Sequence, residues 1–378
     1  MTVFKAVGKC VDQQNFGALT GLRFAAAIMV LFWHLPGYLW FPADAFHGLV
    51  LAQGVSFFFV LSGFVLQHAY QQRIHEIGWS RFIALRFFRL WPAHIAVLVL
   101  VCFRPGAFDW YVHHLPVETI ATVVFLLQAW HTKAEVVYAM NSPSWSISAE
   151  LFFYALFPAL TGPMNRRPLT WMAIAFLTSM FWTWSAKDAG QFIEVNPVAR
   201  LFEFVLGMGC YRLLMRGKAL FGTVLEISVL TIAAASVYIT SHYYWLIPDA
   251  AISYWTTRAG SFVAFAAVIV VFARGKGAVS WILSQPLLIR LGNISFAFYL
   301  VHQPVIYGWG EFGIDLPLWQ EVPAFIAVTI GLSAALHHLV EMPVMRLMRH
   351  ILLKRRQPVA DASLPEPSPV RPVVSPHA

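Results

Sequence analysis

Residues 21–34, GLRFAAAIMVLFWH, belong to an apolar stretch that is long enough to cross a bilayer but contains an arginine and a histidine. An ionisable side chain at membrane depth costs about 3 kcal/mol on insertion scales, so its presence indicates a function and a partner. Arg23 and His34 are eleven positions apart. At about 100° per residue they return to within about 20° of one another, with a rise of about 16 Å. The spacing therefore predicts a single helix face that carries both side chains.

Two interpretations of this face stay open from the pair alone. The face could hold an elongated anionic molecule, with the charge at Arg23 and the reactive end at His34. Alternatively, Arg23 extends toward the lipid headgroups, and His34 is a hydrogen-bonded interior residue. Other features of the chain have to decide between the two.

Composition determines the class of protein. Of the 378 residues, 59% are hydrophobic and 12% are charged, and the mean hydropathy is +0.65. Soluble domains are about one quarter charged, so this composition indicates an all-α, polytopic membrane protein. Residues 1–14 contain no compact apolar core that ends at a small-residue cleavage site, so we expect the first apolar segment to be retained.

Neither a disulfide framework nor a metal site is expected. Cys10, Cys102 and Cys210 are dispersed singly, which favours free thiols. Paired histidines are present, but neighbours on a helix point about 100° apart, and no carboxylate or cysteine recurs at ligand spacing. We therefore predict no metal and no bound cofactor.

Ten apolar segments are long enough to be considered as membrane spans. They lie near residues 17–39, 48–70, 89–104, 145–162, 169–186, 199–215, 220–241, 259–273, 288–307 and 321–340. A further apolar piece at 119–130 is short and is interpreted as re-entrant or interfacial. If this piece crossed the bilayer, every later loop would change sides.

Positive charge favours ten spans with both termini in the cytoplasm, because Lys and Arg accumulate in cytoplasmic loops. In that arrangement the inner segments contain Lys5, Lys9, Arg73, Arg81, Arg86, Arg89, Arg166, Arg167, Arg212, Arg216, Lys218, Arg274, Lys276, Arg346, Arg349, Lys354, Arg355, Arg356 and Arg371, and the outer loops contain Arg104, Lys133, Lys187 and Arg258. The net charge of +8 is then an orientation signal, and nucleic-acid binding is not needed to explain it.

This topology places Arg23 near the cytoplasmic third of the membrane and His34 near the outer third. The fourth span starts at the outer surface with a Pro- and Ser-rich segment and carries Glu150 within its first two turns. We expect Glu150 to lie at the depth of His34, where a carboxylate would raise the basicity of the imidazole and fix its tautomer. The alternative is that Glu150 supports its helix start through the macrodipole.

Two further features each have a structural and a functional interpretation. Arg86 and Arg89 are three apart on one helical face at the expected cytoplasmic boundary, where guanidinium groups bind phosphate or simply anchor the chain. His302 lies in the middle of a span and either lines an acceptor path or is a hydrogen-bonded interior group. The aromatic-rich outer loops 106–116 and 243–257 suit an interfacial belt or sugar stacking.

Taken together, these motifs resemble acyltransferase family 3, a family of integral membrane proteins, and they recur in family order from about residue 17 to 350. The resemblance is carried by Leu19–Arg23 with His34, Gly54–Gly63, Arg86–Pro92, Trp145–Glu150, Arg200–Phe204, Leu291–Ser295 with Tyr299–His302, and Glu341–Pro343. The arginine, ten residues and histidine match that family's signature. The chain departs from the pattern at Thr20 and Ser56, where aspartate is common, and at Met342, where arginine is usual.

The resemblance implies an enzyme that moves an acyl group, most often acetyl, from cytoplasmic acyl-CoA to a hydroxyl of a carbohydrate or a related acceptor. It implies that His34 is the catalytic histidine, that Arg23 is the arginine paired with it, that Arg86 and Arg89 belong to the loop motif, and that Glu150 is the motif glutamate. An imidazole with a pKa near neutrality is suited to take the hydroxyl proton. Acylation of His34 itself, as a relay, stays open.

The implied organisation is a cytoplasmic segment at 1–16, a transmembrane acyltransferase domain at 17–350 and a disordered cytoplasmic tail at 351–378, in the bacterial inner membrane. The expected partners are acyl-CoA, a saccharide or lipid-linked saccharide and the lipid bilayer, with self-association left open. A small-molecule acceptor such as a macrolide would also fit. The rival from another class is a secondary transporter or flippase, in which Arg23, His34 and Glu150 relay protons or anions.

Overall fold

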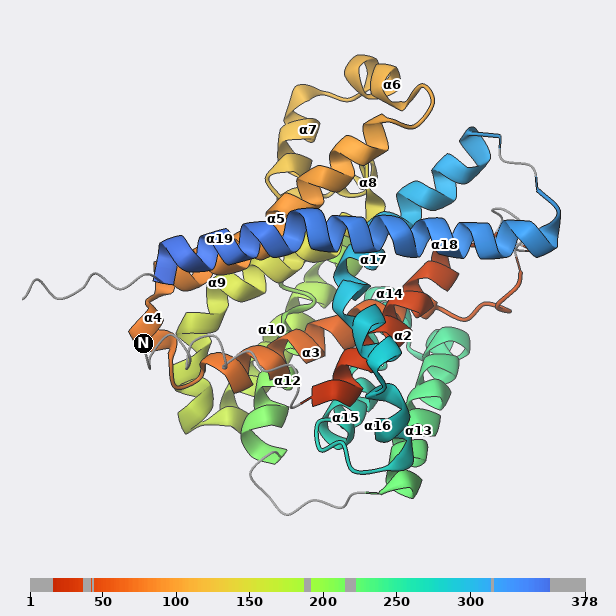
Figure 1. The fold of residues 1–378 in the computed structure, drawn as a ribbon. Helices are drawn as coiled ribbons and strands as arrows, with labels where there is room; N and C mark the ends of the chain where they lie inside the picture. Colours follow the sequence, from red (N-terminus) through yellow and green to blue (C-terminus); the bar gives the residue numbers. More distant parts are fainter. Residues whose placement is uncertain are drawn as a thin grey trace, which may run out of the picture.

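The computed structural model describes residues 16–36, 42, 44–186, 192–214, 222–313 and 316–353, and within these every regular element is a helix (Figure 1). The long helices are α2 (Gly17–His34), α3 (Gly54–Tyr70), α5 (Trp79–Cys102), α9 (Trp145–Arg166), α10 (Pro168–Ser185), α12 (Leu201–Leu214), α13 (Thr223–His242), α14 (Ala250–Ala259), α15 (Phe262–Phe272), α17 (Pro286–Glu311), α18 (Leu318–Leu336) and α19 (Met342–Leu353). The short ones are η2 (Leu51–Gln53), α4 (Ile74–Ile77), α6 (Ala107–His114), α7 (Val117–Val124), η3 (Gln128–Trp130), α8 (Ala134–Val137), η4 (Ser142–Ser144), α11 (Phe192–Val195), η5 (Tyr244–Leu246), α16 (Ala278–Leu283) and the π-helical turn η6 (His337–Glu341).

Seven stretches of the described chain are long and apolar enough to cross a membrane. They are Gly17–His34, Leu51–Tyr70, Trp79–Cys102, Ser142–Arg166, Thr223–His242, Ala250–Phe272 and Trp319–Leu353. Each of the ten apolar segments predicted from the sequence contains a helix in its described part, and the three that are absent from the seven stretches correspond to α10, α12 and α17. The expected all-helical, multi-pass membrane class is therefore confirmed.

Glycines allow the central helices to approach closely. A Cβ atom on Gly63 of α3 would collide with the carbonyl oxygen of Phe204, and one on Gly207 of α12 would collide with that of Val60. A Cβ on Gly292 of α17 would likewise meet the backbone of Thr20 in α2. Small residues at such crossings are typical of helix packing in membranes. They bring α3 against α12 and α2 against α17, around the centre of the molecule.

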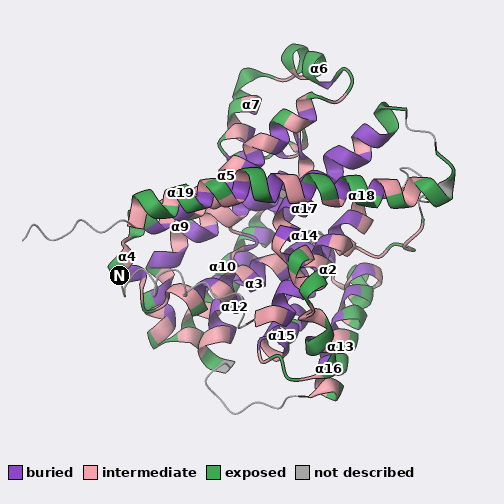
Figure 2. Ribbon diagram, in the orientation of Figure 1, coloured by how far each residue is buried: buried purple, intermediate pink, exposed green. Residues whose placement is uncertain are grey.

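Burial follows this arrangement (Figure 2). Residues of α3, α12 and α17 are mostly buried, whereas α13 exposes large apolar side chains, among them Val224, Ile227 and Ile239. Apolar side chains on the outside of a membrane bundle contact lipid tails, which are as apolar as they are. The helices α18, η6 and α19 form one continuous rod that runs beside α5, and α6 and α7 project from one side of the molecule (Figure 1).

The structure corrects two expected boundaries and shows how the short apolar segment 119–130 is held. Helix α5 begins at Trp79, ten residues before the predicted span, so Arg86, expected between two spans, lies inside this helix. The segment 119–130 is divided between α7 and η3, and side chains of α5 hold it: Trp91 Nε1 donates to the carbonyl of Val124, and His94 Nε2 to that of Val123, each over 2.9 Å. Residues 250–257, expected in a loop, form most of α14.

Several predictions fall on residues that the structure does not describe. These are the N-terminal segment up to residue 15, which contains Cys10, and the tail from residue 354 onward. Within the described chain, Cys102 and Cys210 are free thiols, as expected. Helix α19 continues to Leu353, slightly beyond the predicted end of the membrane domain at 350.

Candidate active site

A cavity of about 270 Å³ lies between α2, α3, α5, α9 and α17. Its polar and charged lining comes from Thr20, Arg23, Ser62, His68, Tyr70, Arg86, Arg89, Ser146, Glu150, Tyr154 and Tyr299, and apolar side chains complete the walls. Four of the residues predicted for the site, Arg23, Arg86, Arg89 and Glu150, are thus gathered around one cavity. Arg23 comes from α2, Arg86 and Arg89 come from α5, and Glu150 comes from α9.

The three arginines differ in whether their N–H donors have a hydrogen-bond partner in the described chain. Arg86 donates to the hydroxyl of Tyr70 and lies over that ring, with 4.9 Å between the guanidinium carbon and the ring centroid. Arg23 and Arg89 make no hydrogen bond or close ion pair with any other described residue. They feel the charges of Glu150 and Glu341 at longer range. Two guanidinium groups therefore line the cavity with donors to spare, and the three arginines outnumber these two carboxylates.

Glu150 does not pair with His34, contrary to the sequence-based expectation. Its carboxylate accepts hydrogen bonds from Ser62, over 2.8 Å, and from Tyr154. Both partners line the arginine-rich cavity. Ser62 projects from α3 and Tyr154 is one turn further along α9, so hydrogen bonds from both helices hold the carboxylate in the cavity lining. Glu150 therefore has no contact through which it could orient the imidazole of His34.

The side-chain partner of His34 is His302. His34 Nδ1 lies 2.9 Å from the carbonyl oxygen of Val30 and 3.2 Å from His302 Nε2. A carbonyl oxygen can only accept, so the proton of His34 resides on Nδ1. By the same argument His302 carries its proton on Nδ1, which lies 2.6 Å from the carbonyl of Tyr299. His302 Nε2 then accepts, and His34 Nε2 keeps an unused lone pair.

His34 lies just beyond the cavity and not in its lining. The cavity ends at Tyr299, whose hydroxyl is held by Ser146 at 2.8 Å and by the carbonyl of Pro143 at 2.9 Å. The ring centroid of Tyr299 is 5.8 Å from that of His302, which in turn is 5.1 Å from that of His34. The chain of contacts from the arginines to the imidazole therefore passes through Tyr299 and His302.

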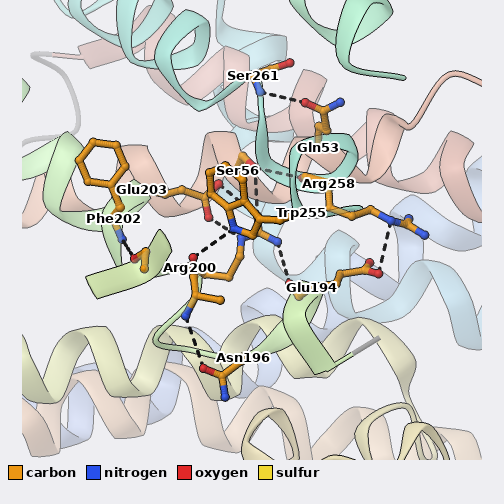
Figure 3. A network of polar contacts seen from close by, with 12 residues as sticks. Gln53, Ser56, Glu194, Asn196, Arg200, Phe202, Glu203, Trp255, Arg258 and Ser261 are labelled. Atoms are coloured by element: carbon orange, nitrogen blue, oxygen red, sulfur yellow. Dashed lines mark hydrogen bonds and ion pairs between the residues drawn. The ribbon is translucent and has the colours of Figure 1, made fainter. Parts of the chain in front are cut away.

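A second polar network surrounds the start of α12 (Figure 3). The buried Arg200 forms a bidentate ion pair with Glu203, with N–O distances of 2.5 and 3.1 Å, and it also donates to Ser56 and to the backbone oxygen of Glu194. Ser56 stands where the resemblance leads one to expect an aspartate. A hydroxyl is sufficient there, because Glu203 already supplies the charge that neutralises Arg200.

Glu341 accepts from His337 over 2.8 Å within the π-helical turn η6. The charge of Glu341 also acts at long range on Arg23 and Arg89, which line the cavity. No cluster of three or more potential metal-ligating His, Cys, Asp or Glu side chains occurs among the described residues.

Comparison with known proteins identifies the family. The acyltransferase domain model of acyltransferase family 3 matches residues 16–338. The chain belongs to this family. It shares 31% identity with the acyltransferase MdmB of Streptomyces mycarofaciens, over 93% of this chain and 95% of that protein. No solved structure matches it.

Two further relatives are also covered along most of their length. Nodulation protein 10 of Rhizobium leguminosarum bv. viciae is 27% identical over 90% of this chain and 95% of its own. The exopolysaccharide production protein ExoZ of Rhizobium meliloti is 26% identical over 79% of this chain and 91% of its own. The family model, over residues 16–338, includes both histidines of the pair.

Proposed function

We propose that this acyltransferase moves an acyl group, in the first place acetyl, from acyl-CoA to a hydroxyl of a cell-surface or exported saccharide. The observation that carries the proposal is the cavity with two unpaired guanidinium groups, Arg23 and Arg89, that ends one residue contact away from the His34–His302 pair. A coenzyme A molecule is long and anionic, so a positively charged, partly apolar channel beside a basic imidazole suits its shape and charge.

In this proposal the arginines bind the donor. Arg86 and Arg89 lie nearer the expected cytoplasmic end and bind phosphate oxygens, and Arg23 binds a deeper polar group of the donor. The thioester then lies at the Tyr299 end. Glu150 and Glu341 limit the surplus of positive charge, so that the empty cavity does not hold three uncompensated guanidinium groups.

His34 is the proposed general base. Its Nε2 takes the proton of the acceptor hydroxyl as the oxygen bonds to the thioester carbonyl carbon. The carbon–sulfur bond then breaks, and the thiolate leaves with the proton returned by His34. During the step the imidazolium donates its Nδ1–H to Val30 and to His302 Nε2, which stabilises the charge without a buried carboxylate. A route through an acylated His34 uses the same geometry.

We place ten helices across the inner membrane with both termini in the cytoplasm, and the two short helices α7 and η3 at the interface. The distribution of Lys and Arg supports this topology. It lets the donor enter from the cytoplasmic side, near Arg86, and lets the acceptor reach His34 from the opposite side.

The saccharide acceptor is supported by the relatives, since one is named for exopolysaccharide production. The names of the other two do not state an acceptor. Because a shared fold does not fix a substrate, the acceptor has to be tested directly.

The test uses purified protein in detergent with labelled acetyl-CoA and a mixture of oligosaccharides, and it measures both thiol release and label in the saccharide. The proposal predicts acceptor-dependent release without a sealed membrane. A pure transporter would show no release in detergent but would move substrate in proteoliposomes, and that result would replace the proposal by the transporter alternative.

A further inference from the structure

Three Arg–Glu ion pairs with N–O distances within 4 Å occur among the described residues. They differ in the number of contacts that join the guanidinium to the carboxylate. Arg104–Glu311 is bidentate, with N–O distances of 2.7 and 2.5 Å. Arg200–Glu203 is bidentate as well. Arg258 and Glu194 touch through a single contact, Nε to Oε2, at 3.3 Å. A bidentate pair uses the directional capacity of both groups, and a single contact leaves most of it free.

The unused groups of the third pair can be named. Glu194 Oε2 also accepts from the hydroxyl of Tyr254 at 2.8 Å, whereas Oε1 has no partner elsewhere in the described chain. The guanidinium of Arg258 is also within range of the Tyr254 hydroxyl, and its remaining N–H donors make no hydrogen bond to the described residues. The side chains are 18% and 10% exposed for Arg258 and Glu194, so they are enclosed but still accessible. Figure 3 shows the Arg258 guanidinium directed away from the closed Arg200–Glu203 pair.

Aromatic side chains surround this pair. The guanidinium carbon of Arg258 lies 4.7 Å from the ring centroid of Trp33 and 5.5 Å from that of Tyr254. Tyr138 is within electrostatic range of Glu194 and Arg258, and its hydroxyl makes no hydrogen bond to another described residue. Spare donors, a spare acceptor and aromatic rings are thus gathered in one place.

The place is next to the proposed base. Trp33 precedes His34 in α2, and the charge of Arg258 acts on His34. The arginine-rich cavity includes none of Trp33, Glu194, Tyr254 or Arg258 in its lining. A molecule bound at the Arg258–Glu194 pair would therefore approach His34 from outside the cavity assigned to the donor.

We propose that Trp33, Glu194, Tyr254 and Arg258 form the acceptor subsite, and that its ligand is a sugar ring with neighbouring hydroxyl groups; this rests on the proposed function. Neighbouring hydroxyls both donate and accept, so one sugar can bind the Nη atoms of Arg258 and Oε1 of Glu194 together, while its apolar face packs against an aromatic ring. An alcohol with a single hydroxyl would leave part of the pair without a partner, which a buried polar site disfavours.

The chemistry of the bound sugar balances as follows. A ring hydroxyl next to the pair gives its proton to His34 Nε2, its oxygen bonds to the thioester carbonyl carbon, and the carbon–sulfur bond breaks. The thiolate takes the proton from His34, so the products are an O-acyl sugar and free coenzyme A thiol. Arg258 and Glu194 bind and orient the sugar and do not exchange a proton in this step.

The test is a binding measurement without any donor. Saturation-transfer NMR is recorded on the protein in lipid nanodiscs with cellotetraose and N-acetylchitotetraose as probes and cyclohexanol as the single-hydroxyl control. We expect a signal for at least one tetrasaccharide and none for cyclohexanol. Arg258→Gln and Glu194→Gln should each weaken saccharide binding by about 10- to 100-fold, the effect of losing a hydrogen bond to a charged group.

Matched controls separate the subsite from a general effect of breaking an ion pair. Arg104→Gln and Glu311→Gln break a pair of the same composition that also lies beside a tyrosine, and saccharide binding should be unchanged. Arg89→Gln should also leave saccharide binding intact. A variant is included only if its melting temperature equals that of the wild type. If Arg258→Gln does not fold, Arg258→Lys, which keeps the charge, takes its place in the binding measurement.

The proposal is overturned if the wild type binds neither tetrasaccharide, if cyclohexanol binds equally well, or if Arg258→Gln and Glu194→Gln bind like the wild type. Because no donor is present, loss of acyl transfer does not affect this measurement. Saccharide binding through Arg258 in a protein that never cleaves acetyl-CoA would contradict the proposed function and leave the subsite in place.

Discussion

At the scale of single residues, the account depends on which partner each ionisable side chain has. The sequence was sufficient to place Arg86 and Arg89 on one helix face, because helical spacing relates neighbours within one segment, whereas their grouping with Arg23 came from the family resemblance. It could not predict that His34 pairs with His302, 268 positions away, because periodicity does not tell which helices are neighbours. The same limit led to the wrong pairing of Glu150, whose partner Ser62 belongs to another helix.

His302 should act through His34. We expect His302→Ala to lower kcat by about 10-fold or more, because the imidazolium of His34 would lose an acceptor for its Nδ1–H, while the KM for acetyl-CoA changes little. Steady-state kinetics on the purified variant measures this. His94→Gln is the matched control. His94 is as buried as His302 and also donates to a backbone carbonyl, but it is not part of the chain of contacts from the cavity to His34. A normal kcat in folded His302→Ala would show that the pair is structural.

Arg89 should contribute to donor binding. Arg89→Gln is expected to raise the KM for acetyl-CoA by about 10-fold or more, since a charge-assisted hydrogen bond to phosphate is lost. Added salt should also raise the KM of the wild type, because it screens the attraction between the arginines and the phosphates. Arg104→Gln, an arginine outside the cavity, is the control. Equal KM values for Arg89→Gln and the wild type would remove Arg89 from the donor site.

At the scale of elements, the helices cross where glycines permit it. Helix α3 crosses α12 at Gly63 and Gly207, where an added Cβ atom would collide with a backbone carbonyl oxygen of the facing helix. The start of α5 was placed too late, because the apolar run that marks a span begins only near residue 89. Arg86 and Arg89 line the cavity from this helix, and arginine is a good helix former.

Gly63→Ala should destabilise the protein by about 1–3 kcal/mol or more, because the added methyl group overlaps a carbonyl oxygen of the facing helix. A thermal melt in detergent measures the change. Gly162→Ala in α9 is the matched control, since nothing lies within 4 Å of the position of its added Cβ, and alanine is the better helix former by about 1 kcal/mol. Equal melting temperatures for the two variants would contradict the close crossing.

At the scale of the whole molecule, the predicted class is correct because composition and apolar length report directly on a bilayer. The arrangement of the helices around the cavity was not predictable from the same signals. The pair Arg258–Glu194 illustrates this, since one member lies in α14 and the other in the short helix α11, and neither sits in a recognisable motif.

The topology can be tested with reporter fusions. A fluorescent protein fused after residue 353 should fluoresce, and alkaline phosphatase fused there should be inactive, because both chain ends are placed in the cytoplasm. Alkaline phosphatase inserted at Gly106, before α6, should be active. Activity of the phosphatase at both positions would mean that the number of spans between them is even and that the ten-span arrangement is wrong.

The most direct test of the central claim compares wild type with His34→Ala and His34→Gln in detergent, using labelled acetyl-CoA and an oligosaccharide that the wild type acetylates. Mass spectrometry measures the acetylated sugar, and a melting curve confirms that each variant is folded. We predict that both variants lose activity by about 100-fold or more, the contribution of a positioned general base. Full transfer by folded His34→Ala would contradict the account.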